Sequence, residues 1–229
     1  MEKLEIYNNV NYINIVNIIA GIIFIYGVTV KNKEVQEQRM RGYFIQAAKE
    51  ILKGEGLQVA SVRNIADQAG YSYATLYNYF KDIKDLIFVC VQDFQDECTE
   101  FVIHEAENTP RGIEKVKLII KSYTKYFIQY PGIFELFFLE KISDISNKNS
   151  NIKLIYTFLD RLCAEEWDYC INENIITAEE ADIQKSQIRY IVTGLLLFYI
   201  NRRYPDSYSE FMEIIDRQLN YIIDRKSVV

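Results

Sequence analysis

The chain has 229 residues, of which 49% are hydrophobic, with nine Gly, three Pro and a formal net charge of −6. Apolar content near one half excludes a fully disordered chain, and so few turn-forming residues favour helices over a turn-rich β fold. The sequence has one His and lacks a Gly-rich phosphate loop, a nucleophile elbow and spaced metal ligands. It therefore predicts neither an enzyme nor a bound metal or other cofactor.

The first thirty residues differ in composition from the rest. No charged residue occurs between Glu5 and Lys31, and Asn, Ile and Tyr supply sixteen of the first thirty positions. Three interpretations stay open for residues 1–30. In the first interpretation, the coding start was placed too early, so that the native chain would begin near Lys31. Alternatively residues 10–30 are an apolar membrane anchor of a tethered sensor-regulator, since about 20 residues span a bilayer. As a third possibility they form an extension packed on the body.

The next segment predicts a helix-turn-helix. A first helix is expected at Val35–Lys53, a second at Val62–Ala69 and a third at Tyr73–Phe80. Ser61 and Ser72 are suited to cap the second and third helices, and Gly70 to end the second with a positive φ. Short and aromatic polar residues cover the outer face of the third helix. Such a face is poorly suited to core packing and well suited to entry into the major groove of DNA.

The expected DNA contacts are of two kinds. The start of the second helix offers free amides and an Arg side chain to phosphate or guanine, and the third helix offers base contacts and hydroxyls. Tyr77 and Tyr79 have the alternative role of covering the small core. Arg39 and Arg41 either add backbone contacts or lie on a solvated face. The predicted DNA-binding residues are Ser61, Val62, Arg63, Tyr73, Ala74, Thr75, Tyr77, Asn78, Tyr79 and Lys84.

Helical periodicity continues to the C-terminus. Further helices are expected at Ile83–Glu107, Arg111–Gln129, Ile133–Ser143, Ile152–Asn172, Ala178–Arg203 and Tyr208–Asp224, with a polar loop at Asp144–Asn151. The predicted fold is all-α, with about nine helices. A helix-turn-helix domain at residues 31–86 precedes a helical body at residues 87–229.

Charge divides in the same way along the chain. Residues 31–90 hold nine Lys/Arg and seven Asp/Glu, whereas residues 91–229 hold sixteen and twenty-three. A local basic surface on an otherwise acidic protein is compatible with DNA binding. Cys90, Cys98, Cys163 and Cys170 form no CxxC pair, which indicates buried thiols in a reducing cytoplasm, with a redox switch as the alternative.

The segment Ser61–Leu86 resembles the tetracycline-repressor-like (TetR/AcrR) family of bacterial transcription factors. Including the first helix, the resemblance covers about 50 residues, and it is carried by Val62-Arg63-Asn64-Ile65-Ala66, Ala69-Gly70-Tyr71-Ser72, Thr75-Leu76-Tyr77-Asn78-Tyr79-Phe80 and Leu86. Three positions depart from the family pattern. Ala74 stands at a usual glycine, Tyr71 at a smaller aliphatic residue and Ile83 at a usual lysine. The phosphate contact of that lysine would then fall to Lys84 or Lys81.

The resemblance implies a homodimeric, ligand-responsive regulator, expected to be a repressor of a palindromic double-stranded DNA operator. It implies a dimer interface formed by the helices at Ala178–Arg203 and Tyr208–Asp224. It also implies a pocket in the body for a small apolar or aromatic effector. Aromatic residues there have core packing as their alternative role, and Glu135, Glu140 or Glu166 near them would suit a flat or cationic apolar ligand. The predicted ligand-binding residues are Tyr123, Phe127, Phe137, Phe138 and Trp167.

Overall fold

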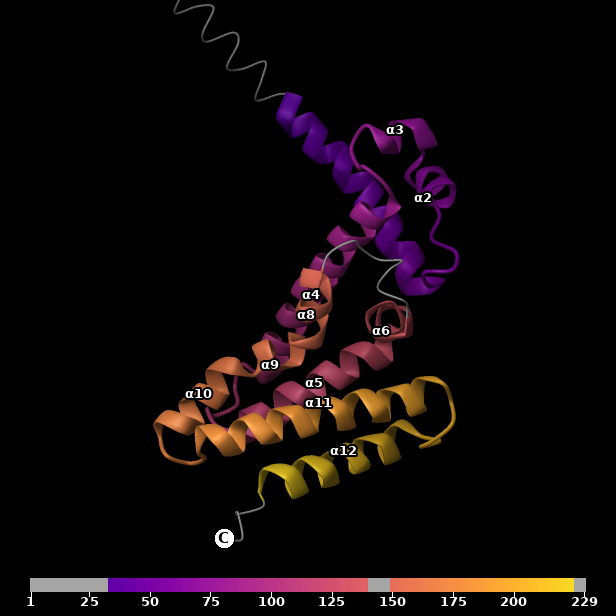
Figure 1. Ribbon diagram of the computed structural model, residues 1–229. Coiled ribbons are helices and arrows are strands. Elements are labelled where there is room, and N and C mark those ends of the chain that lie inside the picture. The colour runs from indigo at the N-terminus through magenta and orange to yellow at the C-terminus, as the bar shows by residue number, and fades with distance from the viewer. Residues whose placement is uncertain (1–32, 140–148, 225–229) are drawn as a thin grey trace, which may run out of the picture.

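The computed structural model describes residues 33–139 and 149–224, and every regular element in these two ranges is an α-helix (Figure 1). The predicted all-α fold is therefore confirmed. The predictions for residues 1–30 concern a segment outside the described ranges. Among the described helices, none has the length and apolar character needed to span a bilayer.

The N-terminal unit consists of the helix at residues 33–54, α2 (Val62–Ala69) and α3 (Tyr73–Tyr77), which lie together in Figure 1. Side chains at helical spacing on the first helix pack against the inward faces of α2 and α3. This arrangement buries apolar side chains that hold the two short helices in place, and they are continuous with the core of the rest of the protein. The buried side chains of this unit are Phe44, Ala47, Ala48, Ile51, Leu52, Ile65, Ala66, Leu76 and Phe80.

Helix α4 (Ile83–Ala106) connects this unit to the body (Figure 1). The Asp82 side chain caps its first turn by accepting a hydrogen bond from the Asp85 amide at 2.9 Å. Its 24 residues make a rod about 36 Å long at 1.5 Å per residue. The predicted domain boundary after residue 86 falls within the first turn of this rod, so both parts of the chain share one continuous helix.

The body is built around α5 (Ile113–Gln129), which packs against α4, α6, α9, α10, α11 and α12. Because α5 is enclosed on so many sides, its polar residues Lys117, Ser122 and Thr124 are buried along with its apolar ones. The other helices of the body are α6 (Pro131–Phe138), α8 (Asn149–Tyr156), α9 (Phe158–Leu162), α10 (Ala164–Asn172), α11 (Ala178–Ile200) and α12 (Tyr208–Ile223).

Some predicted helix limits were wrong. The single helix expected at Ile152–Asn172 is three helices, broken at Thr157 and Cys163. The Thr157 hydroxyl donates to the Lys153 carbonyl at 2.8 Å, a back-bond that bends helices. Residues 149–151, expected in a loop, belong to α8. Helix α6 begins at Pro131 and ends at Phe138 instead of running from Ile133 to Ser143.

The third helix is also shorter than predicted, since α3 ends at Tyr77 instead of Phe80. The next residues form a tight turn in which the Tyr79 amide donates to the Leu76 carbonyl at 3.0 Å. The Tyr79 carbonyl is taken by Arg41. This turn folds Phe80 back into the core.

The N-terminal end of α6 abuts the last turn of the helix at residues 33–54. A Cβ atom added at Gly132 would lie 2.3 Å from the Leu52 carbonyl oxygen and 3.1 Å from that of Lys53. Real Cβ atoms do not approach backbone oxygens at the shorter distance, so a glycine is required for this contact. The body therefore touches the N-terminal unit through backbone at a second place besides α4.

An ion-pair network reinforces the junction between the helix at residues 33–54 and α4. Lys49 Nζ lies 2.6 Å from Glu97 and 3.3 Å from Asp93, and Lys53 Nζ lies 2.6 Å from Glu97. Partial burial alone would raise the pKa of the Glu97 carboxyl, but hydrogen bonds and charge from the two lysines outweigh burial and lower it. Burial likewise opposes the charged form of Lys49, yet its acidic partners raise its pKa.

Glu97→Gln should lower the free energy of unfolding at pH 7 by about 1 kcal/mol, as expected for a partly exposed pair. A lowered folded-state pKa means that the Glu97 contribution is complete above the unfolded pKa, about 4.3, and is lost as pH falls through the folded value. Urea unfolding at pH 7 and pH 3 should therefore show a difference from wild type that shrinks at the lower pH. Glu100→Gln, at an exposed position of α4, is the control. An equal loss of unfolding free energy at both pH values would contradict the contribution assigned to the charged form of Glu97.

Candidate DNA-binding surface and effector cavity

The turn between α2 and α3 is fixed by caps that the sequence supplies locally. The Ser61 hydroxyl accepts from the Asn64 amide at 3.1 Å, and the Ser72 hydroxyl accepts from the Thr75 amide at 3.2 Å. Gly70 adopts φ 78° and ends α2 in the left-handed conformation, which glycine adopts at little cost. The predicted second helix and both predicted caps are therefore confirmed, and α3 emerges from the turn in a defined direction.

Several predicted DNA-contacting residues form a continuous exposed surface. Arg63 on α2 is 87% exposed in its side chain, and Tyr73 and Tyr77 on α3 are 64% and 52% exposed. This exposure leaves the two tyrosine rings accessible to a partner. Also exposed are Ser61, Ala74 and Asn78.

The remaining predicted residues are less accessible. Val62 packs against the apolar core, and Tyr79 is half-buried with its ring 6.1 Å from that of Phe44. The Thr75 hydroxyl is 2.9 Å from the Ser72 hydroxyl, so it is engaged within the turn. Lys84 is half-buried at the start of α4. This favours the alternative role of Tyr79 as a cover for the core, whereas Tyr77 faces outward.

Arg41 has a role that its position in the sequence did not reveal. Its guanidinium donates to the Tyr79 carbonyl and lies 4.3 Å from the centroid of the Phe80 ring. The contact joins residues 38 positions apart and fixes the turn that follows α3. Arg41 therefore does not lie on a purely solvated face, and a phosphate contact by its other N–H groups stays a prediction. Arg41 positions the recognition helix.

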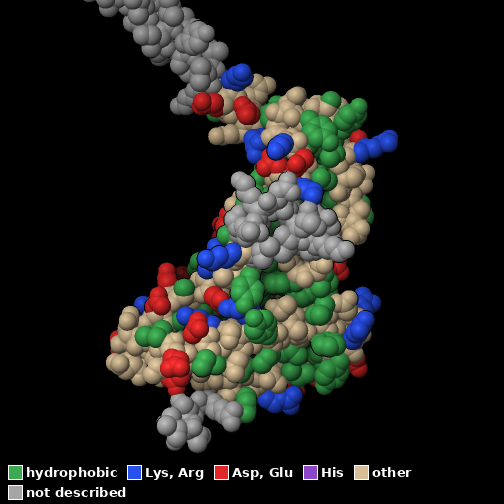
Figure 2. All heavy atoms as spheres, in the orientation of Figure 1, with side chains coloured by type: hydrophobic (Ala, Val, Ile, Leu, Met, Phe, Trp, Pro, Cys, Tyr) green, Lys and Arg blue, Asp and Glu red, His purple; other side chains and the backbone are tan. Residues whose placement is uncertain are grey.

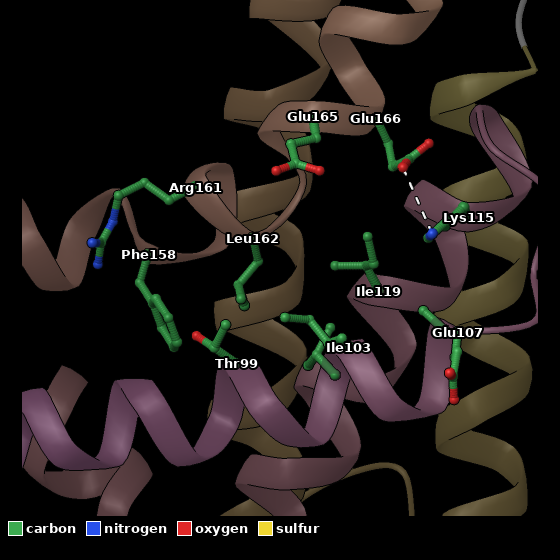
Figure 3. Close-up of a pocket in the computed structure, with 12 residues that line it drawn as sticks. Thr99, Ile103, Glu107, Lys115, Ile119, Phe158, Arg161, Leu162, Glu165 and Glu166 are labelled. Atoms are coloured by element: carbon green, nitrogen blue, oxygen red, sulfur yellow. Dashed lines mark ion pairs between the residues drawn. The ribbon is translucent and has the colours of Figure 1, made fainter.

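The body contains a cavity of about 540 Å³ bounded by α4, α5, α9 and α10 (Figure 3). Figure 3 shows Ile103, Ile119, Phe158 and Leu162 directed toward one space, with Glu165 extending into it from α10. The volume lies within the range of small-molecule sites, about 300–1,000 Å³. Half of the lining residues are apolar and five are charged; the lining consists of Thr99, Val102, Ile103, Ala106, Glu107, Lys115, Ile119, Phe158, Arg161, Leu162, Glu165 and Glu166.

One wall of the cavity is fixed by the buried carboxylate of Glu166. It accepts hydrogen bonds from the Gly112 amide at 2.9 Å and from Arg111 Nε at 3.3 Å, and it lies 3.8 Å from Lys115 Nζ. These partners neutralise the charge and satisfy the buried amide, which would otherwise carry a desolvation cost. Glu166 therefore joins the start of α5 to α10 and keeps this wall rigid.

The five aromatic residues predicted to bind a ligand lie outside this cavity. Tyr123, Phe127, Phe137 and Trp167 are buried in the core, and Phe138 packs against it. The Tyr123 and Phe127 rings meet edge to face with centroids 4.8 Å apart, a geometry typical of core packing. None of the five lines the 540 Å³ cavity, so their role in ligand binding stays a prediction. Of the three acidic residues named with them, Glu166 lines the cavity and Glu135 does not, while Glu140 lies outside the described residues.

The four cysteines are buried and unpaired, as the sequence predicted. Burial raises the pKa of the Cys90 thiol to about 12, and burial also raises the pKa of Cys98, Cys163 and Cys170. The thiols are therefore protonated at neutral pH and weak nucleophiles. Among the described residues no group of His, Cys, Asp and Glu is arranged to hold a metal ion.

Both the helix-turn-helix and the overall fold are similar to those of known proteins. Residues 44–90 match the model of bacterial regulatory proteins of the tetR family. A search of curated proteins found no match. The fold is similar to that of a TetR family transcription regulator from Marinobacter aquaeolei VT8, with a TM-score of 0.59 and 16% identity over 83% of this chain and 97% of that chain.

Two similar structures contain ligands. The regulator FadR from Bacillus subtilis in complex with stearoyl-CoA has a TM-score of 0.61 and 17% identity over 79% of this chain and 96% of that chain. RolR in complex with resorcinol has a TM-score of 0.61 and 11% identity over 82% of this chain and 89% of that chain. At these identities the likeness concerns the fold, whereas the family model matches the helix-turn-helix itself. Residues 44–90 are therefore similar to the helix-turn-helix of bacterial regulatory proteins of the tetR family, and the chain as a whole shares the fold of these regulators.

Proposed function

We propose that the protein is a ligand-responsive transcriptional repressor that binds a palindromic operator as a homodimer. The observation that carries this proposal is the exposed face of α3, presented by a capped turn directly after α2. In this arrangement α3 enters the major groove, and Arg63 with the first turn of α2 contacts the backbone or a guanine edge. The described residues offer no catalytic constellation to rival this function. A cytoplasmic location follows from the DNA target and the reduced thiols.

The proposed partner surface for dimerisation is an apolar stripe on α11. Ile183, Tyr190, Leu197 and Phe198 are all exposed and recur at helical spacing, and Figure 2 shows hydrophobic side chains gathered near the junction of α11 and α12. Such a stripe is stabilised by burial against a second copy. A two-fold dimer would place two recognition helices about 34–36 Å apart, one turn of DNA.

The sequence expectation for the two dimer helices needs one correction. The apolar stripe of α12 faces its own chain, because Phe211, Ile215 and Leu219 are buried there. In α11, Leu196 is likewise buried within the protomer. The residues proposed to face a partner are therefore the exposed members of the α11 stripe, together with exposed residues of α12 such as Tyr208 and Tyr221.

The proposed effector site is the cavity beside α4. The apolar half of its lining suits a small apolar or aromatic ligand, and the bound ligands of two proteins with this fold are stearoyl-CoA and resorcinol. The C-terminal half of α4 borders the cavity, while its first turns, at Leu86 and Ile87, pack in the apolar core near the recognition unit. A ligand that prefers a shifted α4 would move the two recognition helices apart and so lower operator affinity.

Arg63→Ala should weaken operator binding by about 1–3 kcal/mol and leave the fold intact, because this side chain is almost fully exposed. Fluorescence anisotropy with labelled duplexes recovered by selection on the full chain would measure the affinity. Binding should also fall steeply with salt, since phosphate neutralisation releases counterions. If Arg63 contacts a phosphate, the salt slope of the variant should decrease by about one.

Lys153→Ala is the matched control, since it removes an exposed charge from α8, far along the chain from the recognition unit. It should bind like wild type. A complete absence of duplex binding by the wild-type chain at low salt would overturn the proposed function. Equal affinity of the Arg63→Ala variant and wild type would overturn the role of Arg63.

A further inference from the structure

The turn before α3 and α3 itself carry no charged side chain. Between Asp67 and Lys81 the sequence contains no Asp, Glu, Lys or Arg, and this interval includes the turn and all of α3. The side chains that α3 and its end expose are those of Tyr73, Ala74, Tyr77 and Asn78. Figure 2 shows hydrophobic side chains gathered over this part of the molecule, with basic side chains beside them.

This composition restricts which bases α3 is able to read. Guanine is recognised in the major groove by the paired donors of Arg or by Lys, and α3 carries neither. Thymine presents a methyl group there, which apolar surfaces contact, and adenine presents a donor and an acceptor that match the amide of Asn. Exposed rings and an alanine methyl are therefore complementary to thymine, and Asn78 is complementary to adenine.

From this surface, and resting on the proposed function, we infer that the centre of each operator half-site is A·T-rich and is read through thymine methyl groups. Tyr73, Ala74 and Tyr77 bury those methyl groups, while Asn78 pairs with adenine. Arg63 lies outside α3 and contacts the flank of the half-site. Sequence specificity thus comes from apolar contacts at the centre of each half-site, whereas basic side chains around α3 supply the electrostatic attraction to DNA.

The platform that presents these side chains is rigid, which such shape-dependent contacts require. The Tyr43 and Tyr71 rings stack with centroids 6.0 Å apart at the turn. At the other end of α3, Arg41 fixes the backbone at Tyr79 and lies over Phe80. Because both ends are held, little conformational entropy is lost when the exposed rings meet the bases.

The inference is tested by removing the thymine methyl groups. Duplexes bound by the full chain are first selected from a randomised pool, and each thymine of a recovered site is then replaced by deoxyuridine. Burying one methyl group contributes about 0.8 kcal/mol, so each contacted position should lose about fourfold in affinity. Tyr73→Ala and Tyr77→Ala should each bind more weakly and abolish the loss at the thymine that the missing ring covered.

Arg63→Ala is the control in this cycle. It should bind more weakly than wild type and still lose about fourfold on deoxyuridine replacement, because its contact lies elsewhere. Thermal melting of all variants checks the fold, which exposed substitutions should leave unchanged. Recovered sites with G·C centres, or full tolerance of deoxyuridine at every position, would overturn the inference and leave the proposed function standing. Failure to recover any bound duplex would instead overturn the proposed function.

Discussion

Phe198→Glu should split the proposed dimer into folded monomers that no longer hold the operator. Phe198 is 52% exposed within one protomer, so the substitution leaves the protomer core intact. At a two-fold interface the new carboxylate would be buried without a partner in both copies. A cost of about 3–5 kcal/mol for an uncompensated buried charge corresponds to a more than hundredfold weaker dimer.

Sedimentation equilibrium measures the oligomeric state, and anisotropy measures operator affinity at the same concentrations. Ile175→Glu is the matched control, because Ile175 is equally exposed but lies in the turn before α11. That variant should stay dimeric. Leu196→Glu is a less informative choice, since Leu196 is fully buried within its own chain and the substitution would unfold the protomer. A Phe198→Glu dimer as stable as wild type would place the interface on another surface.

Gly132→Ala should be the most damaging single-methyl change in the described part of the protein. Its Cβ would lie 2.3 Å from the Leu52 carbonyl oxygen, and a backbone oxygen in a helix has no rotamer by which to move away. Overpacking of this kind costs about 1–3 kcal/mol, and here the upper end is expected. Relief requires α6 to separate from the helix at residues 33–54, which would also shift the recognition unit and weaken operator binding.

Gly42→Ala is the corresponding control, since an added Cβ there meets nothing within 4 Å. It lies within the helix at residues 33–54, so alanine should stabilise that helix by about 0.5–1 kcal/mol. Urea unfolding would measure both effects, and anisotropy would report operator affinity. Unchanged stability and affinity in the Gly132→Ala variant would show that the contact yields freely and does not couple the body to the recognition unit.

The helix-turn-helix could be predicted because its signals are local. Ser61, Gly70 and Ser72 each act on backbone within four residues, so the sequence alone specifies where α2 and α3 begin. The role of Arg41 could not be predicted, because its partners lie 38 residues away and depend on how the helices pack. The break at Thr157 was also missed, since it arises from a side-chain hydrogen bond and leaves no Gly or Pro in the sequence.

The candidate cavity was less predictable than the recognition surface. Large aromatic residues such as Phe127 and Trp167 were expected to line it, but their volume is used to fill the centre of the body. The space remains where medium-sized side chains such as Ile103, Ile119 and Leu162 meet. Periodicity identifies which face of a helix is apolar, but it does not distinguish a face packed on a neighbour from one that borders a gap.

Because α4 is long, a small tilt at the cavity produces a larger displacement at the opposite end of the helix. A tilt of about 3° about the cavity end of a rod about 36 Å long displaces its far end by about 2 Å. In a two-fold assembly both rods tilt, so the spacing of the recognition helices changes by about 4 Å, more than the separation of neighbouring base pairs. In the proposed dimer, an effector that displaces one or two side chains at the cavity would therefore be able to move both recognition helices out of register with DNA.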